Sequence, residues 1–166
     1  SIHTTMTSDK TKSHMAEYAK DVKLVDVVSY TGLTPGVEYT VSGKLMVKST
    51  GKAYVDKDGN EVIAETKFKP DKADGNLQVK FDVDTTKFAG HTLVAFETVT
   101  DDKDVVLGEH KDINDEGQSV VVKTKPVVQT GIMAISTPLC VATMAALLMS
   151  VGGFIVFTVR RKRRMR

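Results

Sequence analysis

Residues 37–47 read Val-Glu-Tyr-Thr-Val-Ser-Gly-Lys-Leu-Met-Val, and the alternation within this segment decides the fold class. Apolar side chains occupy one face (Val37, Tyr39, Val41), and polar or charged side chains occupy the other (Glu38, Thr40, Ser42). A period of two residues is typical of a β-strand with one buried face. The segment therefore predicts a strand whose apolar side packs on a core.

Short segments of the same kind recur along the first 123 residues, separated by turns rich in Gly, Pro, Asp and Asn. The expected strands cover residues 1–7, 22–30, 37–47, 62–68, 77–83, 92–99, 105–107 and 119–123. A hairpin turn is expected at 56–60, residues 8–20 are expected to form a loop, and no segment has a helical stripe. This pattern predicts an all-β, immunoglobulin-like β-sandwich over residues 1–124.

The C-terminal part has a different composition. Residues 132–159 contain no charged side chain and are longer than the ~20 residues that cross a bilayer core. Six cations follow in residues 160–166, and such a cluster is typical of the cytoplasmic end of a span. We predict a linker at 125–131, a single transmembrane helix at 132–159 and a basic cytoplasmic tail at 160–166.

The net charge of +2 belongs to this tail. Without its six cations the chain has 17 basic against 21 acidic residues, so the composition does not favour nucleic-acid binding. The chain begins at Ser1 without a visible signal peptide, which, together with the membrane-type segment, predicts the C-terminal piece of a longer secreted protein.

Cysteine usage excludes disulfide stabilisation of the predicted sandwich. The single cysteine, Cys140, lies in the apolar segment. An extracellular domain without disulfides needs durability from another source, and a different covalent bond is one option.

Two carboxylates interrupt apolar strands. Asp26 shares a face with Leu24 and Val28 by alternation, and Glu97 lies in the apolar segment 92–99. A carboxylate buried in a sheet must be paired or protonated. Either residue could instead lie on the solvent face of its strand, and periodicity alone leaves both interpretations open.

A third group of polar residues precedes the last strand. Residues 109–119 read Glu-His-Lys-Asp-Ile-Asn-Asp-Glu-Gly-Gln-Ser, which gives the pattern His-x-Asp-x-x-Asp-x-x-Gln-Ser from His110 to Ser119. Taken alone, the stretch is compatible with a metal site, a hydrolase fragment or an ordinary loop.

The pattern resembles the signature of the VaFE or threonine–glutamine ester-bond repeats of Gram-positive surface adhesins. Residues 94–97 spell Val-Ala-Phe-Glu, and residues 25–41 resemble the family segment DTVxYxxLxPGxEYTV. Residues 44–46 and 49–52 resemble its KGTLM and TGKP pieces, and His3-Thr4-Thr5 stands where the family has its Thr-Thr pair. The resemblance covers residues 1–123.

The resemblance implies a role for each matching residue. The Thr4 hydroxyl would attack the side-chain amide carbon of Gln118, expel ammonia and leave an intramolecular ester, with Thr5 as the alternative nucleophile. Asp26, Glu97 and His110 would support this reaction, because a threonine needs a base and an amide needs a proton or hydrogen bond on its oxyanion. Asp112 and Asp115 are expected to shape the loop.

Other hypotheses remain beside the ester. An isopeptide bond would use Lys23, near Asp26, as its donor. A ligand-binding module would need exposed aromatic side chains, and a turnover enzyme would need an open pocket around His110. We expect no enzyme, because a self-cross-link forms once, and we expect no cofactor or metal: the histidines lack zinc-ligand spacing, and the charged turn at 101–104 lacks EF-hand spacing.

The linker resembles a sortase signal of the LPxTG kind. It keeps Thr130 and Gly131 but has Val127-Val128 in place of Leu-Pro. The resemblance implies cleavage between Thr130 and Gly131 and transfer of the Thr130 carboxyl to a peptidoglycan or pilin amine, which would make the membrane helix a temporary anchor. A permanent single-span anchor is the alternative.

Together these features predict a stalk domain at the cell surface, anchored to the wall. Its expected partners are sortase, the wall or pilin amine, and neighbouring repeat domains. A host ligand would bind distal domains.

Overall fold

The computed structural model describes residues 1–127, and residues Ser1–Pro126 form one compact unit. Its elements in chain order are β1 (Ile2–Ser8), β2 (Met15–Ala16), β3 (Val22–Tyr30), β4 (Tyr39–Val47), β5 (Lys52–Ala53), β6 (Ile63–Phe68), β7 (Gly75–Val83), the 3-10 turn η1 (Thr85–Lys87), β8 (Thr92–Thr100), β9 (Val106–His110) and β10 (Ser119–Val122). All eight predicted strands are present in the predicted order.

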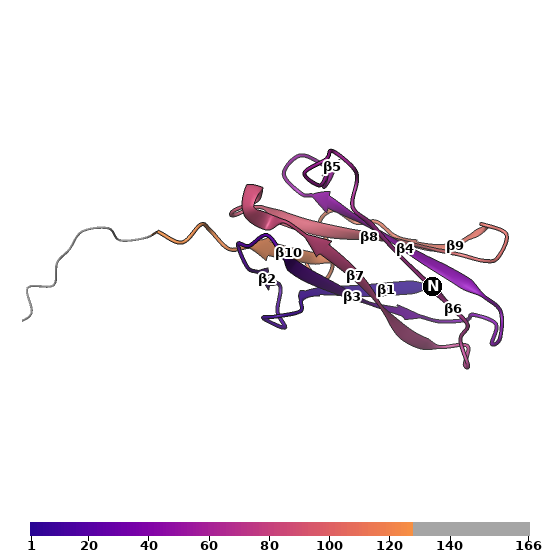
Figure 1. Ribbon diagram of the computed structural model, residues 1–166. Helices are drawn as coiled ribbons and strands as arrows, with labels where there is room; N and C mark the ends of the chain where they lie inside the picture. The colour runs from indigo at the N-terminus through magenta and orange to yellow at the C-terminus, as the bar shows by residue number, and fades with distance from the viewer. Residues whose placement is uncertain (128–166) are drawn as a thin grey trace, which may run out of the picture. The chain divides into compact units, whose positions relative to one another are not determined.

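The strands form two sheets that pack face to face (Figure 1). One sheet has the order β1-β3-β7; the other has the order β2-β10-β8-β4-β5, with β6 also pairing with β4 and β9 with β8. Pairing is antiparallel throughout, apart from the short parallel pair of β2 and β10. The predicted all-β, immunoglobulin-like sandwich is confirmed.

Alternation produces the core between the sheets. In β4, every second residue points inward, and Tyr39, Val41, Leu45 and Val47 are buried. Gly43 occupies the middle inward position of this strand. A Cβ atom there would lie 2.6 Å from Phe81 Cζ and 3.3 Å from Glu97 Oε1, so the glycine leaves the space that the Glu97 carboxyl occupies.

Strand bounds differ from the predictions where edges and turns intervene. β4 begins at Tyr39 instead of residue 37. β9 extends to His110 because it pairs with β8, and the register shifts between Val99 and Thr100. The predicted loop 8–20 contains β2, which pairs with β10.

Residues 1–127 include no helix that is long and apolar enough to cross a membrane. The predicted sortase motif at Thr130-Gly131, the transmembrane helix at 132–159 and the basic tail at 160–166 lie outside the described residues.

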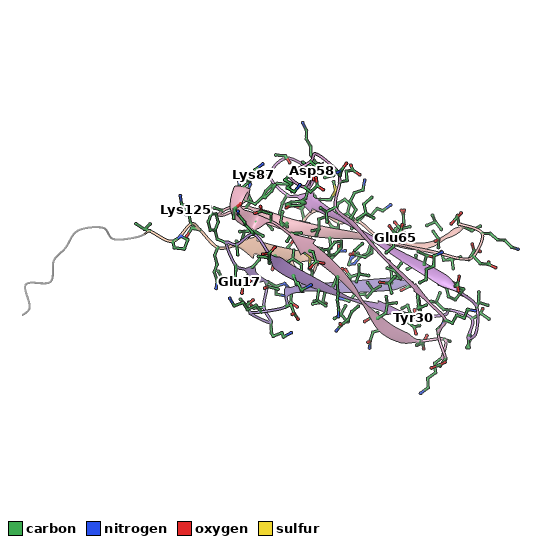
Figure 2. The ribbon with its side chains drawn as sticks, in the orientation of Figure 1. Glu17, Tyr30, Asp58, Glu65, Lys87 and Lys125 are labelled. Carbon is green, nitrogen blue, oxygen red and sulfur yellow. The ribbon has the colours of Figure 1, made fainter. Side chains whose placement is uncertain are left out.

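Tyr30, which pairs with Ile2, and Lys125 lie at opposite ends of the sandwich (Figure 2). The chain therefore starts near one end and leaves from the other.

Candidate functional site: a threonine and a glutamine amide buried between the sheets

The alternation of β1 selects one of the two adjacent threonines. Thr4 is fully buried and pairs with Val28 on β3, whereas Thr5 is exposed. The edge position of β1 brings Thr4 toward β9 and the loop before β10, since Met6 N–H donates to Gly117 O at 2.8 Å. Only the Thr4 hydroxyl therefore faces the interior.

Asp26 and Glu97 approach each other from opposite sheets, Asp26 on β3 and Glu97 on β8. Both are fully buried, so the interpretation that they lie on the solvent face is wrong. Both oxygens of Asp26 and Oε1 of Glu97 lack a hydrogen-bond partner within hydrogen-bonding distance. Two carboxylates in this setting cannot both be charged without a large desolvation cost.

The electrostatics follow from this burial. Burial raises the pKa of Asp26. Burial, followed by the neighbouring Asp26, raises the pKa of Glu97 to about 10. Near neutral pH the pair therefore carries at least one proton, available for donation in an apolar environment.

We expect the domain without a cross-link to be more stable at pH 5 than at pH 8. A carboxyl whose folded pKa is raised binds more protons in the folded state, so stability falls as pH rises from the ordinary value of 4.5 toward about 10. Urea unfolding of a Thr4→Val variant across this range should show the decline. Adding Glu97→Gln should flatten it, whereas the exposed control Glu65→Gln should not. A decline unaffected by Glu97→Gln would contradict the assignment.

Gln118 immediately precedes β10, and its side chain is fully buried. Nε2 donates to Glu97 Oε2 at 3.0 Å and to the His110 backbone carbonyl at 3.1 Å. Its backbone carbonyl accepts from Ala95 N–H at 3.0 Å, and Oε1 has no partner. The amide nitrogen is thus fixed while the carbonyl oxygen stays free to accept a proton or hydrogen bond.

His110 ends β9 opposite Glu97 in the register with β8. Its Nδ1 lies 3.2 Å from Thr4 Oγ1, and its Nε2 lies 3.0 Å from Asp115 Oδ2. A neutral imidazole whose Nε2–H donates to the carboxylate leaves Nδ1 as an acceptor for the Thr4 O–H. This order of groups, hydroxyl, imidazole and carboxylate, is the arrangement that activates a hydroxyl nucleophile.

Asp115, which the sequence predicted only to shape the loop, makes a second contact in the structure. Its Oδ1 accepts from Gly117 N–H at 2.7 Å, as loop shaping requires, while Oδ2 contacts His110. Asp112, in contrast, accepts from Asn114 N–H at 2.9 Å and has no contact with the histidine among residues 1–127. In the sequence, a carboxylate five residues after the histidine is the indication of this contact. Whether its side chain points toward the histidine depends on the fold of the loop.

The isopeptide hypothesis that used Lys23 is wrong for this geometry. Lys23 points out of β3, opposite to the neighbouring inward positions, with 64% of its side chain exposed. Its Nζ pairs with Asp82 Oδ1 at 2.8 Å on β7. It therefore does not reach the buried Asp26.

The ligand-binding and metal-site hypotheses each depend on a feature that can be checked in residues 1–127. The exposed large apolar side chains of residues 1–127 include no aromatic residue. In the charged turn at 101–104, Asp101 Oδ1 accepts from the N–H groups of Lys103 and Val105, both at 2.9 Å. Across residues 1–127, no group of three or more His, Cys, Asp or Glu side chains is placed to bind a metal ion.

The fold and the site together define a β-sandwich in which a buried threonine of the first strand and a buried glutamine before the last strand both contact His110. The chain belongs to the family described as the T-Q ester bond containing domain, whose model matches residues 1–122.

Solved structures show the same fold. Two crystal forms of a bacterial adhesin from Mobiluncus mulieris, described as containing intramolecular disulfide, isopeptide and ester bond cross-links, superpose with TM-scores of 0.58 and 0.55 at 15% and 16% identity. Each match covers 75% of this chain and 57% of the adhesin chain. No curated protein matches the sequence.

Proposed function

We propose that this domain forms an ester between Thr4 Oγ1 and the side-chain carbonyl carbon of Gln118 without help from another protein. The observation that carries the proposal is the contact of the buried Thr4 hydroxyl with His110 Nδ1, beside a buried glutamine amide whose nitrogen is fixed. Membership of the ester-bond family supports the same chemistry.

The steps follow from the contacts. His110 Nδ1 accepts the Thr4 hydroxyl proton as Oγ1 attacks the amide carbon. A proton carried by the Asp26–Glu97 pair stabilises the oxyanion that forms on Gln118 Oε1. The C–N bond then breaks, and Nε2 takes the proton that came from Thr4 and leaves as ammonia. The products are one ester and one ammonia, so no oxidant, metal or external reactant is needed.

This reaction changes the domain once and makes it a structural element. Thr4 and Gln118 are fully buried, so the groups that react are those of the chain itself and not of a free substrate. The resulting bond would tie the first strand to the segment that leads out of the domain.

The wider role that we propose is that of a stalk module in a surface adhesin. The Mobiluncus mulieris adhesin of similar fold supports this setting. On this proposal, sortase cleaves between Thr130 and Gly131, the wall or pilin amine receives the Thr130 carboxyl, and the segment 132–159 retains the precursor at the membrane until then. Neighbouring repeats would continue the stalk toward a distal, ligand-binding head.

Intact-mass spectrometry of residues 1–126 tests the cross-link. The wild-type domain should be lighter than its sequence mass by one ammonia, about 17 Da, since the reaction loses only that molecule. Thr4→Ala should restore the full mass, and Thr5→Ala, a change of the exposed neighbour, should not. Hydroxylamine should cleave the product if it is an ester but not if it is an isopeptide. A folded wild-type domain of unshifted mass would overturn the proposal.

A further inference from the structure

Among residues 1–127, the partly exposed members of the Thr4–Gln118 site are His110 and Asp115. Thr4, Asp26, Glu97 and Gln118 are all fully buried, whereas 19% of the His110 side chain and 24% of the Asp115 side chain are exposed. Of the side chains proposed to take part in the reaction, the imidazole is therefore the one in contact with solvent.

If the proposed ester forms, the exposed imidazole brings solvent close to a bond that water can hydrolyse. Once formed, the ester lies next to an imidazole–carboxylate pair, the same grouping that activates water against acyl intermediates. Water attack on the carbonyl carbon of residue 118 would break its bond to Thr4 Oγ1. Thr4 would regain its hydroxyl, and residue 118 would become a glutamate. The bond persists only if water is kept from His110.

His3 lies beside this imidazole. It precedes Thr4 on β1 and is exposed, yet its ring lies against the His110 ring, with centroids 5.5 Å apart and planes inclined by 37°. Thr5, the exposed residue on the other side of Thr4, makes no side-chain hydrogen bond with the site among residues 1–127. The ring of His3 is thus the side chain placed to cover the imidazole.

We propose that His3 is a positioning residue that shields the cross-link: its ring keeps His110 packed over the ester and excludes water from the site. The role belongs to the aromatic ring and its contact, so another aromatic side chain should fill it. Because His3 is at the surface of an edge strand, it can move aside once for ammonia without disturbing the core.

The test uses the full 166-residue chain incubated in ¹⁸O-labelled water, with intact mass followed over days. Hydrolysis makes residue 118 a carboxylate, about 1 Da heavier than the unreacted amide, with about 2 Da more for one ¹⁸O atom. His3→Ala should form the bond and then lose it about tenfold faster than wild type. His3→Phe should retain it as wild type does, and so should the matched control Thr5→Ala.

Each other outcome counts against the inference. Equal ester lifetimes in wild type and His3→Ala would overturn it, as would equal losses in His3→Ala and Thr5→Ala. A His3→Ala chain that stays at full mass without ¹⁸O would assign His3 to bond formation instead of protection. If wild type itself never loses ammonia, the proposed function fails first, which the unlabelled mass shows directly. Melting temperatures of the variants show whether general loosening explains a faster loss.

Discussion

Replacing Thr4 by valine is expected to lower the free energy of unfolding by about 5 kcal/mol, because it removes the proposed ester between residues 4 and 118. Closing a chain loop of that length restricts the unfolded state, and the chain-entropy treatment of disulfides gives this magnitude. Whole domains are stable by only about 5–15 kcal/mol, so the loss is a large share of the total. The melting temperature should fall by roughly 15–20 °C.

Valine and threonine have nearly the same shape and volume, so the change opens little cavity at the fully buried position 4. In the cross-linked wild type Thr4 Oγ1 carries no proton to donate to His110, so the comparison loses no such hydrogen bond. Urea unfolding should also show a steeper dependence on denaturant for Thr4→Val than for wild type, because an unlinked unfolded chain exposes more surface.

A double-mutant cycle separates the bond from the side chain. In a His110→Ala background, which we expect to form no ester, Thr4→Val should change stability by about 1 kcal/mol or less. The exposed Thr5→Val serves as the surface control on the same strand. A loss of similar size in both backgrounds would show that the stability comes from packing of Thr4 and not from a covalent link.

The position of the link gives it a mechanical consequence. The chain enters near Ile2 and Tyr30 and leaves at the opposite end, near Lys125 (Figures 1 and 2). A bond from β1 to the residue before β10 joins the entering segment to the leaving segment. Tension along the chain would then pass through this bond, so strands β3 to β9 between them would not need to unfold.

The sandwich was predictable because period-two alternation is local information, whereas alternation left the burial of the two carboxylates open. Asp26 and Glu97 fall on the apolar faces of β3 and β8, and burial follows once a second sheet covers those faces. The same alternation places Lys23 on the outer face of β3, between the inward Val22 and Leu24.

The contacts across the site were not predictable in the same way. The Asp115–His110 contact depends on the turn between β9 and β10, where Gly117 N–H and the Ser119 hydroxyl both bind Asp115. The approach of His3 to His110 depends on β1 being an edge strand close to β9, which only tertiary packing determines. The residue types indicated which side chains belong to the site. Which of them contact one another depends on the loop before β10 and on the edge position of β1.

Asp115→Asn is expected to slow ester formation by about a thousandfold or more, through the tautomer of His110. Asparagine can retain the contact with Gly117 N–H through Oδ1, so the loop is preserved. Its amide would then face His110 Nε2 as a donor, which favours the tautomer with the proton on Nδ1. That proton points at Thr4 Oγ1, so the imidazole can no longer accept the threonine proton.

The rate is measured by timed cell-free synthesis of residues 1–126 with acid quenching and intact-mass spectrometry. The fraction lighter by one ammonia gives the extent of reaction at each time. Asp112→Asn is the matched control, because it makes the same chemical change in the same loop without a contact to His110. His110→Ala should leave the chain at full mass over the same period, since general-base assistance accounts for about 10²–10⁴ of the rate.

The two variants together identify the base. If Asp115→Asn reacts as fast as Asp112→Asn, the imidazole–carboxylate pair is not required, and the remaining base would be an ionised member of the Asp26–Glu97 pair. Burial raises the pKa of both of those carboxyls and so favours their protonated forms, which suits them to donate to the oxyanion. A carboxyl kept protonated for that purpose cannot also accept the Thr4 proton. A slow reaction of Asp115→Asn would therefore assign the general base to His110 with Asp115. The proton donor to the oxyanion would then be the Asp26–Glu97 pair.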